Sequence, residues 1–134
     1  MVEILPEIRF LSVEDVQRLH HLQLGRYGGG DGLRDENMLA SAVFQPQQTF
    51  GGEYVYSGIH AMASAYWHGL TMNHPFVDGN KRVGFLSCFV FLATNGYRLV
   101  LHEHEAIETG RQVAQGNVAR ELLARIIQTN TVAI

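Results

Sequence analysis

A cluster of polar side chains separates two apolar segments in the stretch NHPFVDGNKRVGF, residues 73–85. Polar and charged groups that are buried without partners destabilise a fold, so we expect this cluster to face a ligand. Histidine is the side chain that changes charge most readily near neutral pH, so His74 could take a proton from a hydroxyl nucleophile. Asp78 offers carboxylate oxygens, which are ligands that Mg²⁺ prefers. The stretch therefore predicts a general base and a metal ligand in one short segment.

The residues after Asp78 predict an anion site at the start of a helix. The first turn of a helix presents free backbone N–H groups and the positive end of the helix dipole. Gly79 allows a ligand close to the backbone, and Asn80, Lys81 and Arg82 fall in the first turn, where the dipole disfavours cations. Phosphate would compensate this charge, because Arg binds it through a planar fork and Lys as a point charge. A Mg²⁺ ion shared with a nucleotide would then be held at Asp78.

Each of these residues also has a simpler explanation. His74 could end the preceding helix, Asp78 could favour a turn, and Lys81 and Arg82 could be solvated. Taken singly, the simpler explanation is the better one for each residue. Taken together, the residues favour a site, because the turn lies between the two most apolar helices predicted in the chain. Phe76 is expected to pack inward and anchor the turn.

Two helices are predicted to position this turn. From Ser57, a possible cap, apolar residues recur at helical spacing up to a stop by Asn73. From Asn80 a second helix is apolar nearly all round, as expected of a central buried helix that ends at NGYR, residues 95–98.

The remaining segments predict a mainly helical single domain over residues 1–134 with one small β-hairpin flap. The first half of the chain predicts an edge strand at residues 8–11, a helix from a capping box at Ser12 and Asp15 to about Tyr27, and a glycine-rich loop at 28–35. A helix capped by Asp35 follows, with Met38, Leu39, Ala42 and Val43 on one face, and then a loop or hairpin flap at 45–56. The last part of the chain predicts a helix between Glu103 and Gln115 and a closing helix with Val118, Leu122, Leu123, Ile126 and Ile127.

Composition predicts a cytoplasmic protein without direct nucleic-acid or membrane binding. The 134 residues carry a net charge of -3, which gives no general attraction to nucleic acid or anionic lipid. Cys88 is the single cysteine and fits a reduced compartment. The longest apolar run, residues 83–93, is shorter than the ~20 residues that a membrane span needs, and no basic-then-apolar leader is expected.

The motif HPFVDGNKR at residues 74–82 resembles the signature of the Fic/Doc (Fido) superfamily. The Fic branch has the pattern HPFx(D/E)GNGRxxR, and the Doc branch, the death-on-curing toxins, has HxFx(D/N)(A/G)NKR. This chain has Lys81 in place of the second Fic glycine and Phe85 in place of the last Fic arginine, so it is similar to Doc. GLRD at 32–35 and SAVFQPQQTF at 41–50 also look Doc-like.

The resemblance implies a Fido helical bundle and a toxin that transfers the terminal phosphate of ATP to a hydroxyl of a target protein, with elongation factor Tu as the first candidate. It implies that His74 is the general base, Asp78 the Mg²⁺ ligand, Asn80 a phosphate or metal-shell contact, and Lys81 and Arg82 phosphate clamps. Gly79 would supply the close backbone approach.

The resemblance also implies two protein partners. The flap at residues 47–56 would dock the target as an added strand, using exposed backbone at Val55. The inhibitory (S/T)xxxE(G/N) helix of self-restrained Fido proteins has no match in this chain. We therefore expect restraint by an antitoxin whose disordered tail folds onto the toxin.

Two other functions remain open alternatives. One is a Fic-like nucleotidylyl transferase that attaches AMP to a protein hydroxyl, and the other is a catalytically idle module that binds a nucleotide or a partner. An intact His74 argues against the idle module, because a phosphate binder needs no base.

The glycines of GGGDG at 28–32 lack the spacing of a phosphate loop, and HEHE at 102–105 lacks that of an HExxH zinc site.

Overall fold

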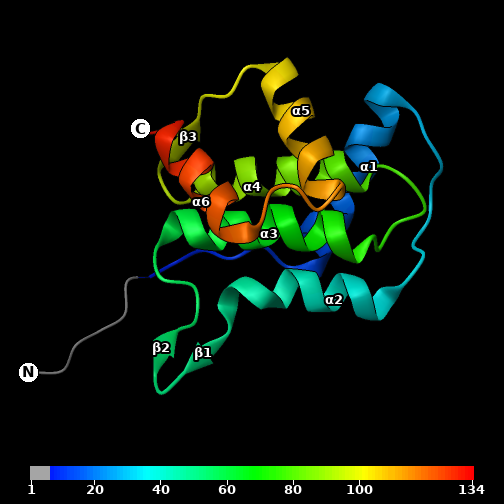
Figure 1. Ribbon diagram of the computed structural model, residues 1–134. Coiled ribbons are helices and arrows are strands. Elements are labelled where there is room, and N and C mark those ends of the chain that lie inside the picture. Colours follow the sequence, from blue (N-terminus) through cyan, green and yellow to red (C-terminus); the bar gives the residue numbers. More distant parts are fainter. Residues whose placement is uncertain (1–6) are drawn as a thin grey trace, which may run out of the picture.

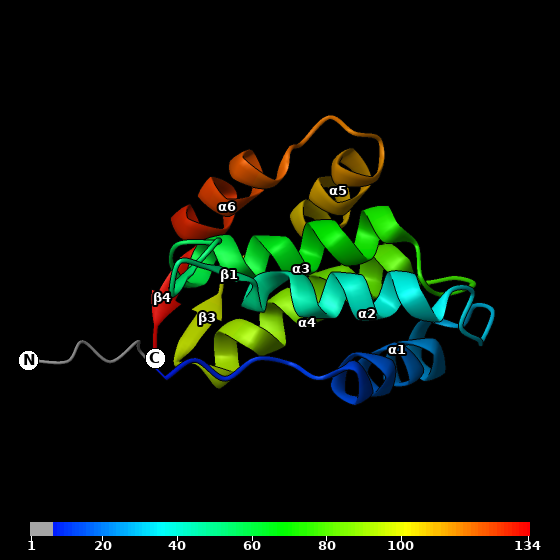
Figure 2. The ribbon, with the colours of Figure 1, turned by 90° about the horizontal axis from the view of Figure 1, so that it is seen from below.

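The computed structural model describes residues 7–134. The expectation about a leader segment concerns residues that lie partly outside this range. An antiparallel pair of helices, α3 (Ile59–Asn73) and α4 (Asn80–Thr94), runs through the middle of the molecule (Figure 1). α5 (Glu103–Ala114) and α6 (Arg120–Thr129) lie on one side of α3, and α2 (Glu36–Phe44) lies on the other (Figure 2). α1 (Val13–Tyr27) packs against α4 and α2. The mainly helical Fido-type fold is confirmed.

Two small antiparallel sheets complete the fold. β1 (Thr49–Phe50) and β2 (Glu53–Tyr54) form the expected hairpin, which follows a 3₁₀ turn at Gln45–Gln47. β3 (Tyr97–Leu99) pairs with β4 (Thr131–Ala133) in the register Tyr97↔Ala133. The sequence did not predict this second sheet, which joins the end of α4 to the end of the chain.

Local capping explains where α1 and α2 begin. The Ser12 hydroxyl accepts the Asp15 N–H at 3.1 Å, and the Asp15 carboxylate accepts the Ser12 N–H at 2.9 Å, so the predicted capping box is confirmed. The Asp35 carboxylate accepts the Met38 N–H at 3.0 Å, as expected of an N-cap. The cap predicted for α3 was wrong, because α3 starts after Gly58 with no side-chain cap from Ser57.

The edge strand predicted at residues 8–11 does not form. The Leu11 N–H donates to the Tyr66 hydroxyl at 2.9 Å, and the Asn95 amide bonds both backbone groups of Arg9. Side chains from the core therefore satisfy this extended backbone, and it has no need of a neighbouring strand.

One hydrophobic core is built mainly from α3 and its neighbours. Its largest fully buried side chains are Trp67, Tyr66 and Phe91. A Cβ added at Gly84 would lie 2.9 Å from the Trp67 carbonyl oxygen, so this glycine lets α4 approach α3 closely. Three details differ from expectation: Met38 and Leu122 are exposed, and several apolar residues of α4 are only half-buried, namely Phe85, Leu86, Phe89 and Val90. None of the described helices is long and apolar enough to cross a membrane.

Candidate active site

The active loop, residues 74–79, joins the end of α3 to the start of α4. His74 ends α3 in the left-handed region, with φ 49° and ψ 53°, and it is the one non-glycine residue of the described chain with positive φ. Such a backbone conformation costs of order 1–3 kcal/mol and persists only where the surroundings impose it. The exposed His74 thus has a backbone conformation that the rest of the fold must stabilise.

Arg34 supplies much of that stabilisation. Its Nε donates to the His74 carbonyl at 2.6 Å, and its Nη2 donates to the Asn73 carbonyl at 3.0 Å. The Pro75 carbonyl accepts the backbone N–H groups of Arg34 at 2.7 Å and Asp35 at 3.0 Å. Sequence reasoning missed Arg34 as a residue of the site. The signal was present in the Doc-like run GLRD at 32–35, but a contact between residues 34 and 74 cannot be read from spacing.

The middle of the loop is fixed by Phe76 and Asn80. Phe76 is 2% exposed, which confirms that it packs inward. The Asn80 amide donates to the Phe76 carbonyl at 3.0 Å, and its oxygen accepts the Phe76 N–H at 2.9 Å. Asn80 is buried, so its side chain serves the loop in this structure, and its predicted contact with phosphate or metal stays a prediction.

The predicted anion site lies at the start of α4. No acidic residue and no side-chain cap occupies its first turn in the described structure, so backbone N–H groups there remain available to a ligand. Lys81 and Arg82 are both exposed. The Arg82 guanidinium lies 4.8 Å from the centre of the Tyr27 ring, a cation–π contact that keeps it beside the loop.

Gly79 has a structural reason that the sequence did not reveal. Its φ is 80°, in the region that favours glycine, and a Cβ at this position would collide with the Gln23 amide nitrogen. The positive φ and the close approach of the Gln23 side chain therefore favour glycine here, independently of any approach by a ligand.

Asp78 is the predicted metal ligand. Its carboxylate is exposed, and one oxygen accepts the Gly79 N–H at 2.8 Å. Among residues 7–134 no group of three His, Cys, Asp or Glu side chains could hold a metal. One carboxylate beside an anion site fits Mg²⁺, which is usually bound through one or two carboxylates plus substrate phosphates and water.

The β1–β2 hairpin lies at the other end of α3 from the active loop (Figure 1). Fifteen residues of α3 separate the two, which corresponds to about 22 Å at 1.5 Å per residue. The Val55 N–H donates to the Gln48 carbonyl at 2.9 Å, so this backbone donor is already used within the hairpin. A target segment docked at the hairpin would have to extend along the molecule to bring its hydroxyl to His74.

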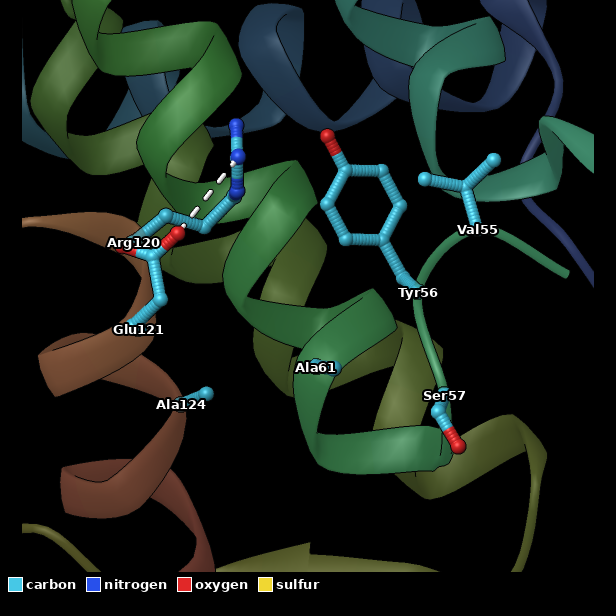
Figure 3. A pocket seen from close by; sticks show the side chains of 7 residues that line it. All are labelled: Val55, Tyr56, Ser57, Ala61, Arg120, Glu121 and Ala124. Atoms are coloured by element: carbon cyan, nitrogen blue, oxygen red, sulfur yellow. Dashed lines mark ion pairs between the residues drawn. The ribbon is translucent and has the colours of Figure 1, made fainter.

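A cavity lies beside the hairpin, between the segment that follows β2, α3 and α6 (Figure 3). The Arg120 guanidinium lies 4.8 Å from the centre of the Tyr56 ring, and Gln45 donates to the Tyr56 hydroxyl at 2.8 Å. The cavity is lined by Val55, Tyr56, Ser57, Ala61, Arg120, Glu121 and Ala124. It contains none of the predicted catalytic residues. His74, Asp78, Gly79, Asn80, Lys81 and Arg82 all belong to the active loop or the first turn of α4.

Comparison with known proteins identifies the family of this chain. A family model described as "Fic/DOC family" matches residues 10–92, which include the whole active loop. The Toxin Doc of Mycolicibacterium smegmatis is 38% identical over 73 residues, or 54% of this chain and 56% of that protein. The Protein kinase doc of Escherichia phage P1 is 27% identical over 92 residues, or 69% of this chain and 72% of that protein. The resemblance to the Doc branch is confirmed, and the chain belongs to the Fic/DOC family.

Proposed function

We propose that this protein is the toxin of a toxin–antitoxin pair and transfers the terminal phosphate of ATP to a hydroxyl group of a target protein. The observation that carries the proposal is the uncapped start of α4, where Lys81 and Arg82 lie beside free backbone N–H groups. His74, exposed and held in a left-handed backbone conformation, lies a few residues before them in the sequence. The names of the two relatives, a toxin and a protein kinase, support the same reading.

In the proposed reaction the target hydroxyl attacks the terminal phosphorus of ATP. A bond forms between the target oxygen and phosphorus, the bond from phosphorus to the bridging oxygen breaks, and ADP leaves. His74 takes the proton of the hydroxyl as it attacks. Lys81, Arg82 and the N–H groups of α4 stabilise the charge on the transferred group. Asp78 would hold Mg²⁺, which neutralises phosphate charge when bound.

Two residues favour transfer of the last phosphate over transfer of AMP. Lys81 and Phe85 lie four residues apart, on one face of α4, and they replace the glycine and arginine of the Fic pattern. Phe85 is half-buried, and its ring packs edge-on against Trp67 with ring centres 5.2 Å apart, so this position offers phosphate no cationic contact. Without a distal arginine, ATP is held with its terminal phosphate against the start of α4.

Intact-mass analysis of the modified target tests this proposal. We expect a mass gain of one phosphate, label from ATP marked at its last phosphate, and a lower yield with Lys81→Gly than with Lys81→Arg. Elongation factor Tu is the first target to try. A nucleotide-sized gain with label from the first phosphate would refute the kinase reading and establish the AMP transferase.

The partner proteins follow from the same proposal. An antitoxin with a disordered tail that folds onto the toxin would restrain it, and the 47–56 hairpin would dock the target. Support for docking comes from its exposed apolar side chains, since Phe50 is 85% and Val55 53% exposed. Harmless expression of the isolated protein, together with full activity on purified target, would contradict restraint by an antitoxin.

A further inference from the structure

Three side chains on one face of α1 contact the active loop and the helix turn that follows it. They are His20, Gln23 and Tyr27, at positions i, i+3 and i+7, which share a face of an α-helix. They contact Asp78, Gly79 and Arg82 respectively. The order of contacts along α1 thus follows the order of the predicted site residues along the loop and α4.

His20 holds the backbone at Asp78. The side chain is 3% exposed, and its Nε2 lies 2.7 Å from the Asp78 carbonyl oxygen. A carbonyl oxygen only accepts hydrogen bonds, so Nε2 carries the proton and donates it. The imidazole ring also stacks on Phe76, with ring centres 3.8 Å apart and planes within 6°. One side chain therefore fixes both the anchor of the loop and the residue that carries the predicted metal ligand.

Gln23 packs against Gly79, at the start of α4. It is 2% exposed, and neither amide atom has a hydrogen-bond partner among the described residues. An unsatisfied buried amide destabilises a fold. An apolar side chain of similar size would serve stability better at this position.

Tyr27 holds the side chain of Arg82. The guanidinium lies over the ring at 4.8 Å, and the ring itself is 50% exposed. An exposed cation–π contact contributes little to folding, but it restricts where a long, flexible arginine can be found.

The composition of the α1 face argues against a purely structural role. The residues that α1 buries fully are Val16, His20 and Gln23, so two of the three are polar, whereas Val13 and Leu19 pack against the core but are only partly buried. A helix that is docked only for stability buries an apolar stripe. Here the polar contacts are made to the residues that carry the predicted chemistry.

We propose that α1 positions the phosphate end of the active site, with His20 acting on Asp78 and Tyr27 acting on Arg82. Neither residue touches the substrate, so both are positioning residues. The roles of Asp78 and Arg82 rest on the proposed function, whereas the restraint of the loop by α1 does not.

Two matched pairs of variants test the proposal. His20→Phe keeps a stacking ring but removes the donor, whereas His20→Gln keeps a donor at a similar reach. Tyr27→Leu removes the aromatic face, whereas Tyr27→Phe keeps it. Amide hydrogen exchange of peptides spanning residues 76–82 reports loop restraint without activity. Calorimetric titration of ATP at increasing MgCl₂ separates the metal requirement from nucleotide affinity.

We expect His20→Phe to speed amide exchange in the active loop but not in α6. The half-saturating Mg²⁺ concentration should rise about tenfold, which is typical when a partner that orients a metal-binding group is lost. His20→Gln should match the wild type in both loop exchange and Mg²⁺ requirement. Tyr27→Leu should weaken ATP binding about three- to fivefold at saturating Mg²⁺, and Tyr27→Phe should not.

Several outcomes would overturn the proposal. Wild-type loop exchange in His20→Phe would do so, as would faster exchange with an unchanged Mg²⁺ requirement, which would mark His20 as structural support only. If His20→Phe fails to fold, equal ATP affinity in the two Tyr27 variants would still refute the role of α1. If the wild-type protein binds no ATP at any Mg²⁺ concentration, the proposed function fails, and loop exchange alone decides whether α1 restrains the loop.

Discussion

The two ends of α3 differ in how the rest of the chain holds them. At its C-terminal end, Arg34 bonds the carbonyls of Asn73 and His74, and His20 bonds that of Asp78. At its N-terminal end, α3 starts after Gly58 without a side-chain cap, and it follows a hairpin of two-residue strands whose Phe50 is 85% exposed. One end is fixed by contacts from distant parts of the sequence, and the other is a small exposed projection.

This difference matches the proposed division between chemistry at the active loop and recognition at the hairpin. Reacting groups must be held in place before the substrate arrives, because small misplacements reduce rates strongly. Partner contacts tolerate more adjustment, and they are often made by exposed loops on a rigid scaffold. The active loop therefore fits the chemical role, and the hairpin with its adjacent cavity (Figure 3) fits the recognition role.

The largest effect is expected from His74→Ala at the fixed end. Loss of a general base typically lowers the rate by ~10²–10⁴. ATP affinity should be unchanged, because the base acts on the incoming hydroxyl and not on the phosphates. Transfer rates and calorimetric ATP binding measure the two effects. Near-normal turnover would reduce His74 to the residue that ends α3.

Asp78→Ala should fold normally, because the carboxylate is exposed, but it should lose transfer activity. A metal ion stabilises the transition state by several kcal/mol, so we expect a loss of about 100-fold or more. Turnover is measured over a range of MgCl₂ concentrations, with excess chelator on the wild type as the control. Full activity of either sample would remove the metal assignment.

Arg34→Ala tests whether distant contacts make the fixed end effective. Release of the two carbonyls should relax the left-handed backbone at His74, and displacement of a reacting group by about 1 Å can cost ~10²-fold in rate. Arg34→Lys should recover little, since Lys lacks the planar fork that bonds both carbonyls. The turnover number should fall more than ATP affinity. Equal turnover in all three proteins would show that the loop holds its shape unaided.

Phe50→Ser tests the exposed end. Because Phe50 makes little contact with the core, thermal stability and ATP binding should stay unchanged. Target modification should fall several-fold, since an aromatic anchor in an interface typically contributes more than about 1 kcal/mol. The matched control is Ile107→Ser, which changes an exposed apolar residue far from the hairpin in sequence, on α5. Unchanged target modification in Phe50→Ser would exclude a role of the hairpin tip in docking.

The smallest effect is expected from acid, through His60 and His68 of α3. Desolvation lowers the pKa of His60, and desolvation together with the charge of Arg120 lowers that of His68, against the opposing effect of Glu121. Each folded pKa lies below the usual 6.5, so the unfolded chain binds protons more readily. This stability is complete above about pH 6.5 and is lost as the pH falls toward the folded pKa.

Thermal unfolding across this pH range provides the measurement. We expect a small decrease in the midpoint on acidification, and a shallower decrease in His68→Gln. His102→Gln, a change of an exposed histidine, is the control. An identical pH profile in His68→Gln and the wild type would exclude this contribution of His68.

The sequence alone determined the features that depend on neighbouring residues. The capping box at Ser12, the bounds of α1 and α4, the end of α3, the hairpin and the order of residues in the active loop could all be predicted. Helical periodicity, capping and turn chemistry act over a few residues, so they are visible in any short window of sequence. The motif at residues 74–82 likewise placed every predicted site residue on the active loop or the helix turn that follows it.

Only the tertiary structure decided which distant residues hold that loop. Arg34 lies 40 residues before His74, and His20 lies 58 residues before Asp78. The backbone at residues 8–11 is satisfied by Tyr66 and Asn95 instead of a strand, and β3 finds its partner at the end of the chain. Each outcome depends on how helices pack in space, since packing selects among many possible long-range partners, and no local pattern encodes that selection.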